Sequence, residues 1–127
     1  MFQYQCVLPP SAAEHGTLEL LRQISASGQA SFLAVLKTFG SLQSPGLLSF
    51  PMQGTTLALD FPNRGEATLN LLDRLDSVVK EARGRLYAAK DARIPKELFL
   101  KSFPQMDQFV NHIDPAFSSS FWRRVKP

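Results

Sequence analysis

Ionisable side chains are concentrated in one short segment, 84–93, which begins with an apolar stretch of strand length. Tyr87 ends the strand pattern, and Lys90, Asp91 and Arg93 come soon after it. A phenol hydroxyl, an ammonium, a carboxylate and a guanidinium can together bind a polar ligand or stabilise charge that develops in a reaction. Because binding and catalytic groups often lie where a scaffold element passes into a loop, we predict a functional site here.

A second set of polar side chains lies in the alternating segment 1–8. Gln3 and Gln5 would share one face of a strand there, whereas Tyr4 and Cys6 would share the other. Each amide offers a donor and an acceptor, which suits the hydroxyl groups of a sugar. The pair of glutamines either forms the wall of a ligand site or is the solvated side of an edge strand.

Two further segments, 32–39 and 55–61, have strand length and carry polar groups for the same sheet face. Lys37 is the single charge in an apolar run, and Thr56 points away from the apolar residues of its own segment. Lys37 is therefore either a ligand-binding group or a lysine that extends into solvent from a strand edge. Thr56 is the weakest of these candidates.

An amphipathic helix is expected between the first two strands. Ser11 and Glu14 have the capping-box spacing that starts a helix, and Ser27-Gly28 supplies the left-handed residue that ends one. The segment 40–54 is rich in proline and glycine and has no periodic pattern. We therefore expect a long loop there that could carry function.

A second amphipathic helix is expected over the apolar stripe 71–82, with Gly84 after its end. Its solvent side is predicted to hold Asp73, Arg74, Asp76 and Lys80. The order strand, helix, strand, strand, helix, strand is that of the split ferredoxin-like α+β arrangement, an antiparallel sheet with both helices on one face. Short helices over 98–103 and 106–113 should follow. The other sheet face is left open and is expected to form half of a binding site.

Composition argues against several classes of function. The 127 residues carry a net charge of +3 without a block of like charge, so we expect one domain and no nucleic-acid binding. One cysteine, Cys6, and two distant histidines, His15 and His112, predict neither a disulfide nor a metal site. There is no apolar run of bilayer-spanning length and no export signal pattern, so membrane binding is not predicted and a cytoplasmic protein is expected.

Several short stretches, taken in order, carry a family resemblance. They are Phe2-Gln3-Tyr4-Gln5, Ser31-Phe32-Leu33, Phe50-Pro51-Met52, Leu57-Ala58-Leu59-Asp60-Phe61-Pro62, Gly84-Arg85-Leu86-Tyr87, Ala89-Lys90-Asp91, Phe103-Pro104 and Asp114-Pro115. Together they resemble the C-terminal, substrate-binding part of the FAD-linked oxidases of the vanillyl-alcohol oxidase superfamily. The likeness is to the branch that contains decaprenylphosphoryl-ribose oxidases and, more loosely, aldonolactone oxidases.

The resemblance implies that residues 1–127 form a substrate-binding (cap) domain that works with a flavin-binding domain or subunit. The residues that it implies for the site are Lys90 and Tyr87 as catalytic groups, Lys90 also beside FAD, and Gln3, Gln5, Lys37 and Thr56 against a sugar-like substrate. A fixed ammonium beside a flavin would favour its reduced form. The implied activity is oxidation of a sugar or polyol hydroxyl by hydride transfer to flavin, with the isolated chain inactive.

Two features differ from that family. Thr56 and Ala58 stand where the nearest branch carries an amide and a thiol, which predicts a different substrate. The sequence has no strand followed by a glycine-rich loop that could hold a pyrophosphate, so FAD would be bound mainly by the other domain. The alternative is a free-standing ferredoxin-like module without catalysis, which binds a small ligand or forms a homodimer through its open sheet face.

Overall fold

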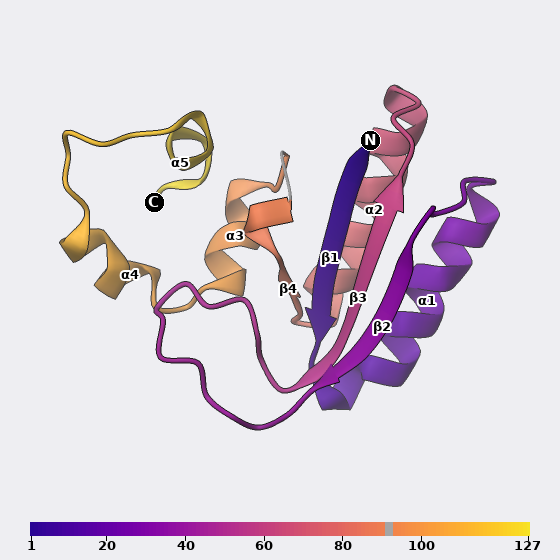
Figure 1. Cartoon of the computed structure of the whole chain (residues 1–127), viewed down its shortest axis with the longest axis horizontal. Coiled ribbons are helices and arrows are strands. Elements are labelled where there is room, and N and C mark those ends of the chain that lie inside the picture. Colours follow the sequence, from indigo (N-terminus) through magenta and orange to yellow (C-terminus); the bar gives the residue numbers. More distant parts are fainter. Residues whose placement is uncertain (91–92) are drawn as a thin grey trace.

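The computed structural model describes residues 1–90 and 93–127, and its elements follow the expected order (Figure 1). The elements are β1 (Phe2–Leu8), η1 (Pro10–Ala12), α1 (Ala13–Ala26), β2 (Ala34–Phe39), β3 (Gly54–Phe61), α2 (Glu66–Glu81), β4 (Arg85–Leu86), η2 (Ala88–Lys90), α3 (Lys96–Ser102), α4 (Met106–Phe109), η3 (Val110–His112) and α5 (Ser120–Val125). Asp91, which belongs to the segment predicted to be functional, lies outside the described residues.

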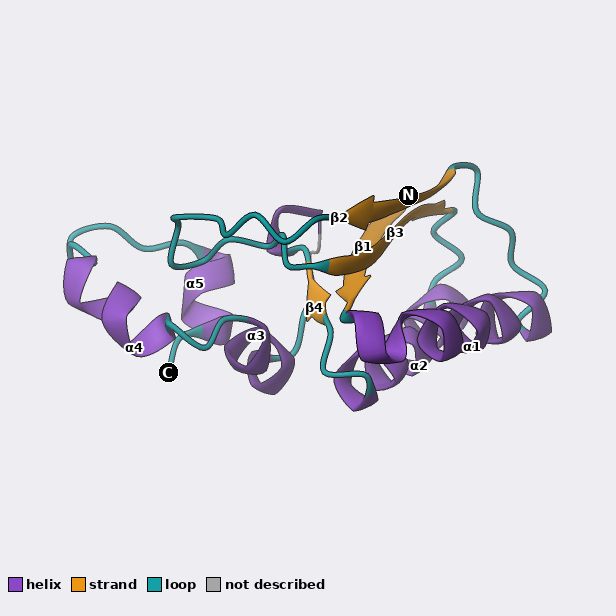
Figure 2. Ribbon diagram, turned by 90° about the horizontal axis from the view of Figure 1, so that it is seen from below, coloured by secondary structure: helices purple, strands orange, loops and turns teal. Residues whose placement is uncertain are grey.

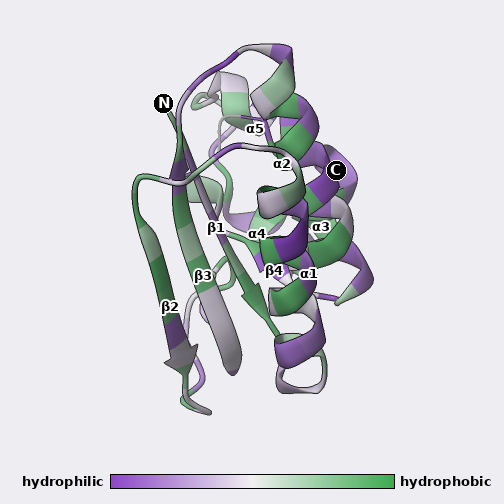
Figure 3. Cartoon of the chain, turned by 90° about the vertical axis from the view of Figure 1, so that its right-hand side faces the viewer, coloured by the Kyte–Doolittle hydropathy of each residue, from purple (hydrophilic) through white to green (hydrophobic). Residues whose placement is uncertain are grey.

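The strands form one antiparallel sheet in the order β2-β3-β1-β4, with α1 and α2 on one of its faces. Figure 3 shows both helices on one side of the sheet, with β2 farthest from them. This arrangement confirms the ferredoxin-like α+β prediction. The helices α3, α4 and α5 lie beyond β4, at the opposite end of the molecule from α1 (Figure 2).

The apolar core lies between the sheet and the helices. Register pairs Tyr4 with Leu59 and Cys6 with Leu57, so these side chains share the face that α2 covers with Leu71, Leu72 and Leu75. The core continues past β4 into the C-terminal helices, where its buried residues include Phe99, Phe103, Met106 and Val125. Among the described residues, none of the helices is both long enough and apolar enough to span a lipid bilayer.

The start of the first helix differs from the prediction. Ser11 lies inside the short η1 turn, and α1 begins at Ala13 with no side-chain cap, so the predicted capping box is wrong. The preceding prolines explain this, because a fixed proline φ favours a tight turn at this point. The predicted end is confirmed: Ser27 is the C-cap residue of α1, and Gly28 adopts a φ of 66°.

The turn after α2 also differs in its detail. Arg83, with a φ of 55°, takes the left-handed position that Gly84 was expected to occupy. Gly84 is needed for space instead, because a Cβ atom there would lie 2.5 Å from the Val7 carbonyl oxygen. The glycine therefore allows β4 to approach β1 closely.

Asp76 is buried, which contradicts its predicted position on the solvent side of α2. Arg93 explains the burial: its Nη1 and Nη2 both lie 2.9 Å from Asp76 Oδ2, and its Nη1 also lies 3.0 Å from Asp73 Oδ1. Arg93 is thus not a plain surface charge beside a helix. The ion pair connects Arg93 to α2 on the helix-covered side of the sheet.

The buried face of β1 holds two groups with raised pKa values. Burial raises the pKa of the Cys6 thiol to about 12. Burial also raises the pKa of the Tyr4 hydroxyl above its ordinary range, and the nearby Cys6 and Asp76 raise it further. Both groups are therefore neutral at physiological pH.

Candidate functional site

The face of the sheet opposite α1 and α2 collects most of the predicted site residues, in three neighbouring cross-strand rows. Gln5 pairs with Ala58 on β3, and Ala58 pairs in turn with Val35 on β2. On the other side of β1, the Tyr87 amide donates to the Gln5 carbonyl oxygen at 2.8 Å, so β1 and the chain after β4 continue to pair there. We call this surface, with Gln3, Gln5, Val35, Lys37, Ala58, Asp60 and Tyr87, the open face.

Gln3 lies at the exposed end of the open face. It pairs with Asp60 across β1 and β3, so an amide and a carboxylate stand next to each other on adjacent strands. Gln3 is exposed and Asp60 is half-buried. This end of the face can therefore offer both donors and acceptors to a hydroxylated molecule.

Thr56 lies on the same side of the sheet but is completely buried. Its hydroxyl donates to the Cys6 carbonyl oxygen at 2.8 Å and accepts from Gln5 Nε2 at 3.1 Å. The hydroxyl thus orients the Gln5 side chain, which leaves the carbonyl oxygen of that amide for another partner. Direct binding of a substrate by Thr56 stays a prediction, and the contact seen here is a positioning contact.

Lys37 is exposed on β2, directly across from Thr56. Because β2 is an edge strand of the sheet, both predicted roles fit this position: an ammonium that reaches over the open face, or one that extends into solvent. The register places Lys37 one cross-strand row away from Gln5, on the same face. Lys37 is thus available to a ligand that covers both its own row and the row of Gln5.

Lys90 ends the η2 turn, which contacts β1 on the side of β4 (Figure 1). The Lys90 amide donates to the Tyr87 carbonyl oxygen at 3.0 Å, so the turn connects the two residues that the resemblance implies as catalytic. Lys90 is half-buried. On the far side of the turn, Arg93 is held by its ion pair with Asp76. Lys90 is thus tied to Tyr87 through the backbone, and Arg93 is tied to α2 through its side chain.

A feature that sequence reasoning missed is the cover over one end of the sheet face. Phe50, in the loop 40–53, is buried between Tyr87, with ring centroids 4.8 Å apart and stacked, and Phe39, with an edge contact at 6.1 Å. The loop therefore closes the end near Thr56 and leaves the end near Gln3 open. Phe50 is the one aromatic residue of this loop, and that was the available signal, because large apolar side chains are usually buried.

Comparison with known proteins gives a relative that aligns with nearly the whole chain. The chain is 38% identical over 130 residues to the decaprenylphosphoryl-β-D-ribose oxidase of Mycolicibacterium smegmatis, and the alignment covers 98% of this chain and 27% of that protein. The chain is a homologue of an oxidase. It is also 36% identical over 127 residues to an uncharacterized protein in the mprA 5' region of Streptomyces coelicolor, covering 96% of this chain and 34% of that protein.

The M. smegmatis oxidase is thus much longer than the part of it that aligns with this chain. The chain spans between a quarter and about a third of the length of these two relatives. No family model matches the chain. In the part of the chain that the structure describes, no group of three or more histidine, cysteine, aspartate or glutamate side chains is placed to hold a metal ion.

Proposed function

We propose that this chain is the substrate-side part of an FAD-dependent oxidoreductase that oxidises a sugar or polyol hydroxyl. One observation carries the proposal: Gln5, Tyr87 and the Lys90 turn meet at one partly covered sheet face, in a chain homologous to an oxidase. The amides would bind substrate hydroxyls, and Lys37 would hold a further polar group at the β2 side.

The residues around η2 fit the polar edge of a flavin ring. Lys90 is a half-buried residue with an ammonium group, and Tyr87 carries a phenol hydroxyl on the open face. When bound, FAD would supply the oxidant that accepts two electrons from the substrate carbinol. The chain's own groups would orient the substrate and place positive charge next to that oxidant. The nucleotide part of FAD would be held by another domain or subunit.

A chimera tests the proposal. This chain replaces the matched part of the M. smegmatis oxidase, and flavin content and substrate-dependent flavin bleaching are followed by absorbance. We expect flavin to be retained and to be bleached by a sugar alcohol. Lys90→Ala should slow the bleaching at least tenfold with flavin content unchanged, because an ammonium aimed at developing charge contributes on the order of 2–4 kcal/mol.

Lys96→Ala is the matched control, because Lys96 is an exposed lysine at the start of α3. It should bleach at the rate of the unmodified chimera. A chimera that holds flavin but is not bleached by any sugar or polyol would contradict the proposed function. Equal rates for Lys90→Ala and Lys96→Ala would remove Lys90 from the mechanism.

The second candidate is a self-contained module that forms a homodimer through the open face. The observation in its favour is that this face mixes apolar Val35 and Ala58 with polar groups and is covered by the protein's own loop at one end only. Light scattering of the purified chain distinguishes the two. A stable dimer that Gln3→Arg and Ala58→Arg dissociate would favour the module.

A further inference from the structure

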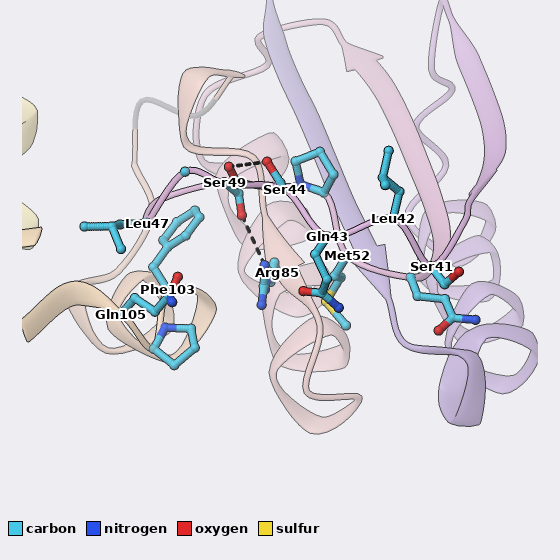
Figure 4. Close-up of a pocket in the computed structure, with 14 residues that line it drawn as sticks. Ser41, Leu42, Gln43, Ser44, Leu47, Ser49, Met52, Arg85, Phe103 and Gln105 are labelled. Atoms are coloured by element: carbon cyan, nitrogen blue, oxygen red, sulfur yellow. Dashed lines mark hydrogen bonds between the residues drawn. The ribbon is translucent and has the colours of Figure 1, made fainter. Parts of the chain in front are cut away.

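A polar cavity lies beside the open face, between the loop 40–53 and the turn after α3 (Figure 4). Its volume is about 350 Å³. Ser49 and Pro51 line it, whereas Phe50 between them packs against Tyr87 on the sheet. The register pairs Arg85 with Val7, on the same side of the sheet as Gln5, so the cavity adjoins the end of the sheet face that the loop covers. Nothing in the proposed oxidase function uses this cavity.

Among the described residues, Arg85 is the only one with a charged side chain that lines the cavity. Its Nη1 donates to the Ser49 carbonyl oxygen at 3.1 Å, and Figure 4 shows this contact between the loop and the strand. A guanidinium carries five N–H donors, so most of them remain for another acceptor. Arg85 thus fixes one wall of the cavity and still has donors to offer.

The two arginines near the sheet differ in whether a carboxylate pairs with their positive charge. Arg93 has two carboxylates, Asp73 and Asp76, whereas no carboxylate of residues 1–90 and 93–127 forms an ion pair with Arg85. Partial burial lowers the pKa of Arg85 from its usual value, because desolvation disfavours the charged form. A partly desolvated cation without an anion costs free energy that a bound anion would recover.

The rest of the wall suits an anion that carries hydroxyl groups. It consists of serine hydroxyls, glutamine amides and six apolar side chains, and none of the described residues that line it is acidic. The residues with polar side chains are Ser41, Gln43, Ser44, Ser49, Gln53 and Gln105. A volume of about 350 Å³ falls within the range of small-molecule sites, which begins at roughly 300 Å³. The ligand can therefore be larger than the anionic group alone.

We infer that this cavity binds a small hydroxylated oxyanion, a phosphate or a carboxylate, with Arg85 as its charged partner. Arginine recognises both groups through two parallel N–H donors. The serine and glutamine side chains contact the hydroxylated body of the ligand. The site is independent of the oxidase proposal, so either can fail without the other.

The test is a titration of the 127-residue protein with inorganic phosphate and, separately, with gluconate, at constant ionic strength balanced with sodium chloride. Amide and arginine side-chain NMR signals report binding. We expect saturable shifts at Arg85 and Gln105 with at least one of the two anions, and the anion that saturates identifies phosphate or carboxylate chemistry. Absence of saturable shifts with both anions would overturn the inference.

Two pairs of variants locate the binding. Arg85→Gln should weaken it at least tenfold, whereas Arg83→Gln, an equal loss of charge at an exposed residue, should not. Because Arg85 also holds Ser49, a second pair leaves that contact in place. Gln105→Glu puts a carboxylate on the cavity wall and should also weaken binding tenfold, whereas Gln108→Glu, exposed on α4, should not. Unchanged binding in Gln105→Glu would contradict the site.

Discussion

The two faces of the sheet use polar residues in opposite ways, although they share the strand β1. On the face toward the helices, Tyr4 and Cys6 are buried, and Asp76 holds Arg93 in a charged pair. On the open face, Gln3 is exposed, and the Gln5 side chain donates one hydrogen bond to the Thr56 hydroxyl. The charged pair on the buried face stabilises the fold, whereas groups with unused hydrogen-bonding capacity on the open face can serve a ligand.

The loop 40–53 divides the open face into a closed and an open end. The end near Thr56 has the character of a core, because Phe50 packs between Tyr87 and Phe39 there and Val7 and Thr56 are completely buried. The end near Gln3 has no such cover from the described residues and keeps its polar groups accessible. The following predictions test this division, in order of expected effect.

The closed face should give the largest loss of stability. Asp76→Ala leaves Arg93 partly buried without its main partner, and breaking a buried ion pair costs about 3–5 kcal/mol. The free energy of unfolding, measured by urea denaturation, should fall by about that amount. Asp73→Ala removes the exposed partner of the same arginine and should cost less than about 1 kcal/mol. Equal losses in the two variants would show that burial does not separate their roles.

The cover over the sheet should give the next largest effect. Phe50→Ala removes a buried ring from its contacts with Tyr87 and Phe39, and such truncations cost about 3 kcal/mol. Hydrogen exchange at the Thr56 amide should become faster in this variant. Leu42→Ala, at a leucine that is 95% exposed in the same loop, should change the stability by less than about 0.5 kcal/mol.

Alkaline pH should weaken the closed face through Cys6. The pKa of the thiol is about 12 in the folded protein against 9.0 for a free thiol, so the unfolded chain loses its proton first. The contribution of Cys6 is complete below pH 9 and is lost as the pH rises toward 12. Between pH 8 and 10 the wild-type protein should lose about 1 kcal/mol more than Cys6→Ala, as measured by urea denaturation at each pH. Parallel pH profiles would contradict the burial of this thiol.

The open face should tolerate substitution. Gln3→Ala should change the free energy of unfolding by less than about 0.5 kcal/mol, because the side chain is exposed. Gln5→Ala should cost about 1 kcal/mol, because Thr56 loses a hydrogen-bond donor. Urea denaturation measures both. A loss above about 3 kcal/mol in either variant would assign that glutamine to the core instead of a ligand site.

The smallest effect is expected at Glu97, an exposed carboxylate in the first turn of α3 that accepts a hydrogen bond from Lys80 of α2. Hydrogen bonds from Lys101 and Lys80 lower the pKa of Glu97 to about 2 from 4.5. Its contribution to stability is therefore present above pH 4.5 and is lost as the pH falls toward 2. Thermal denaturation should show a slight advantage of the wild type over Glu97→Gln at pH 6 that disappears at pH 2.

Hydrophobic periodicity was sufficient to predict the architecture. The period-two segments became β1 and β3, and the apolar stripe 71–82 became most of α2, because both patterns repeat along a regular backbone. The faces of Gln3, Gln5, Lys37 and Thr56 followed for the same reason, since alternation fixes the side of a strand on which a residue lies. The roles of these residues in binding, and those of Tyr87 and Lys90, stay predictions.

The errors arose where the outcome depended on residues distant in sequence. The polar type and position of Asp76 predicted a solvated residue, and its burial follows from Arg93, which the fold brings to it from beyond β4. The complete burial of Thr56 was likewise not predictable from its own segment, because alternation fixes the side of the sheet on which a residue lies and not what covers that side.

The sequence by itself therefore determined the order of the elements and the side of the sheet on which each strand residue lies, because these depend on repeats between neighbours in the chain. Only the tertiary structure decided which polar groups have a hydrogen-bond or charge partner. Asp76 with Arg93, Gln5 with Thr56, and the cavity at Arg85 each join segments at least 17 residues apart in sequence. Contacts of this kind are set by packing in three dimensions, which a local pattern does not encode.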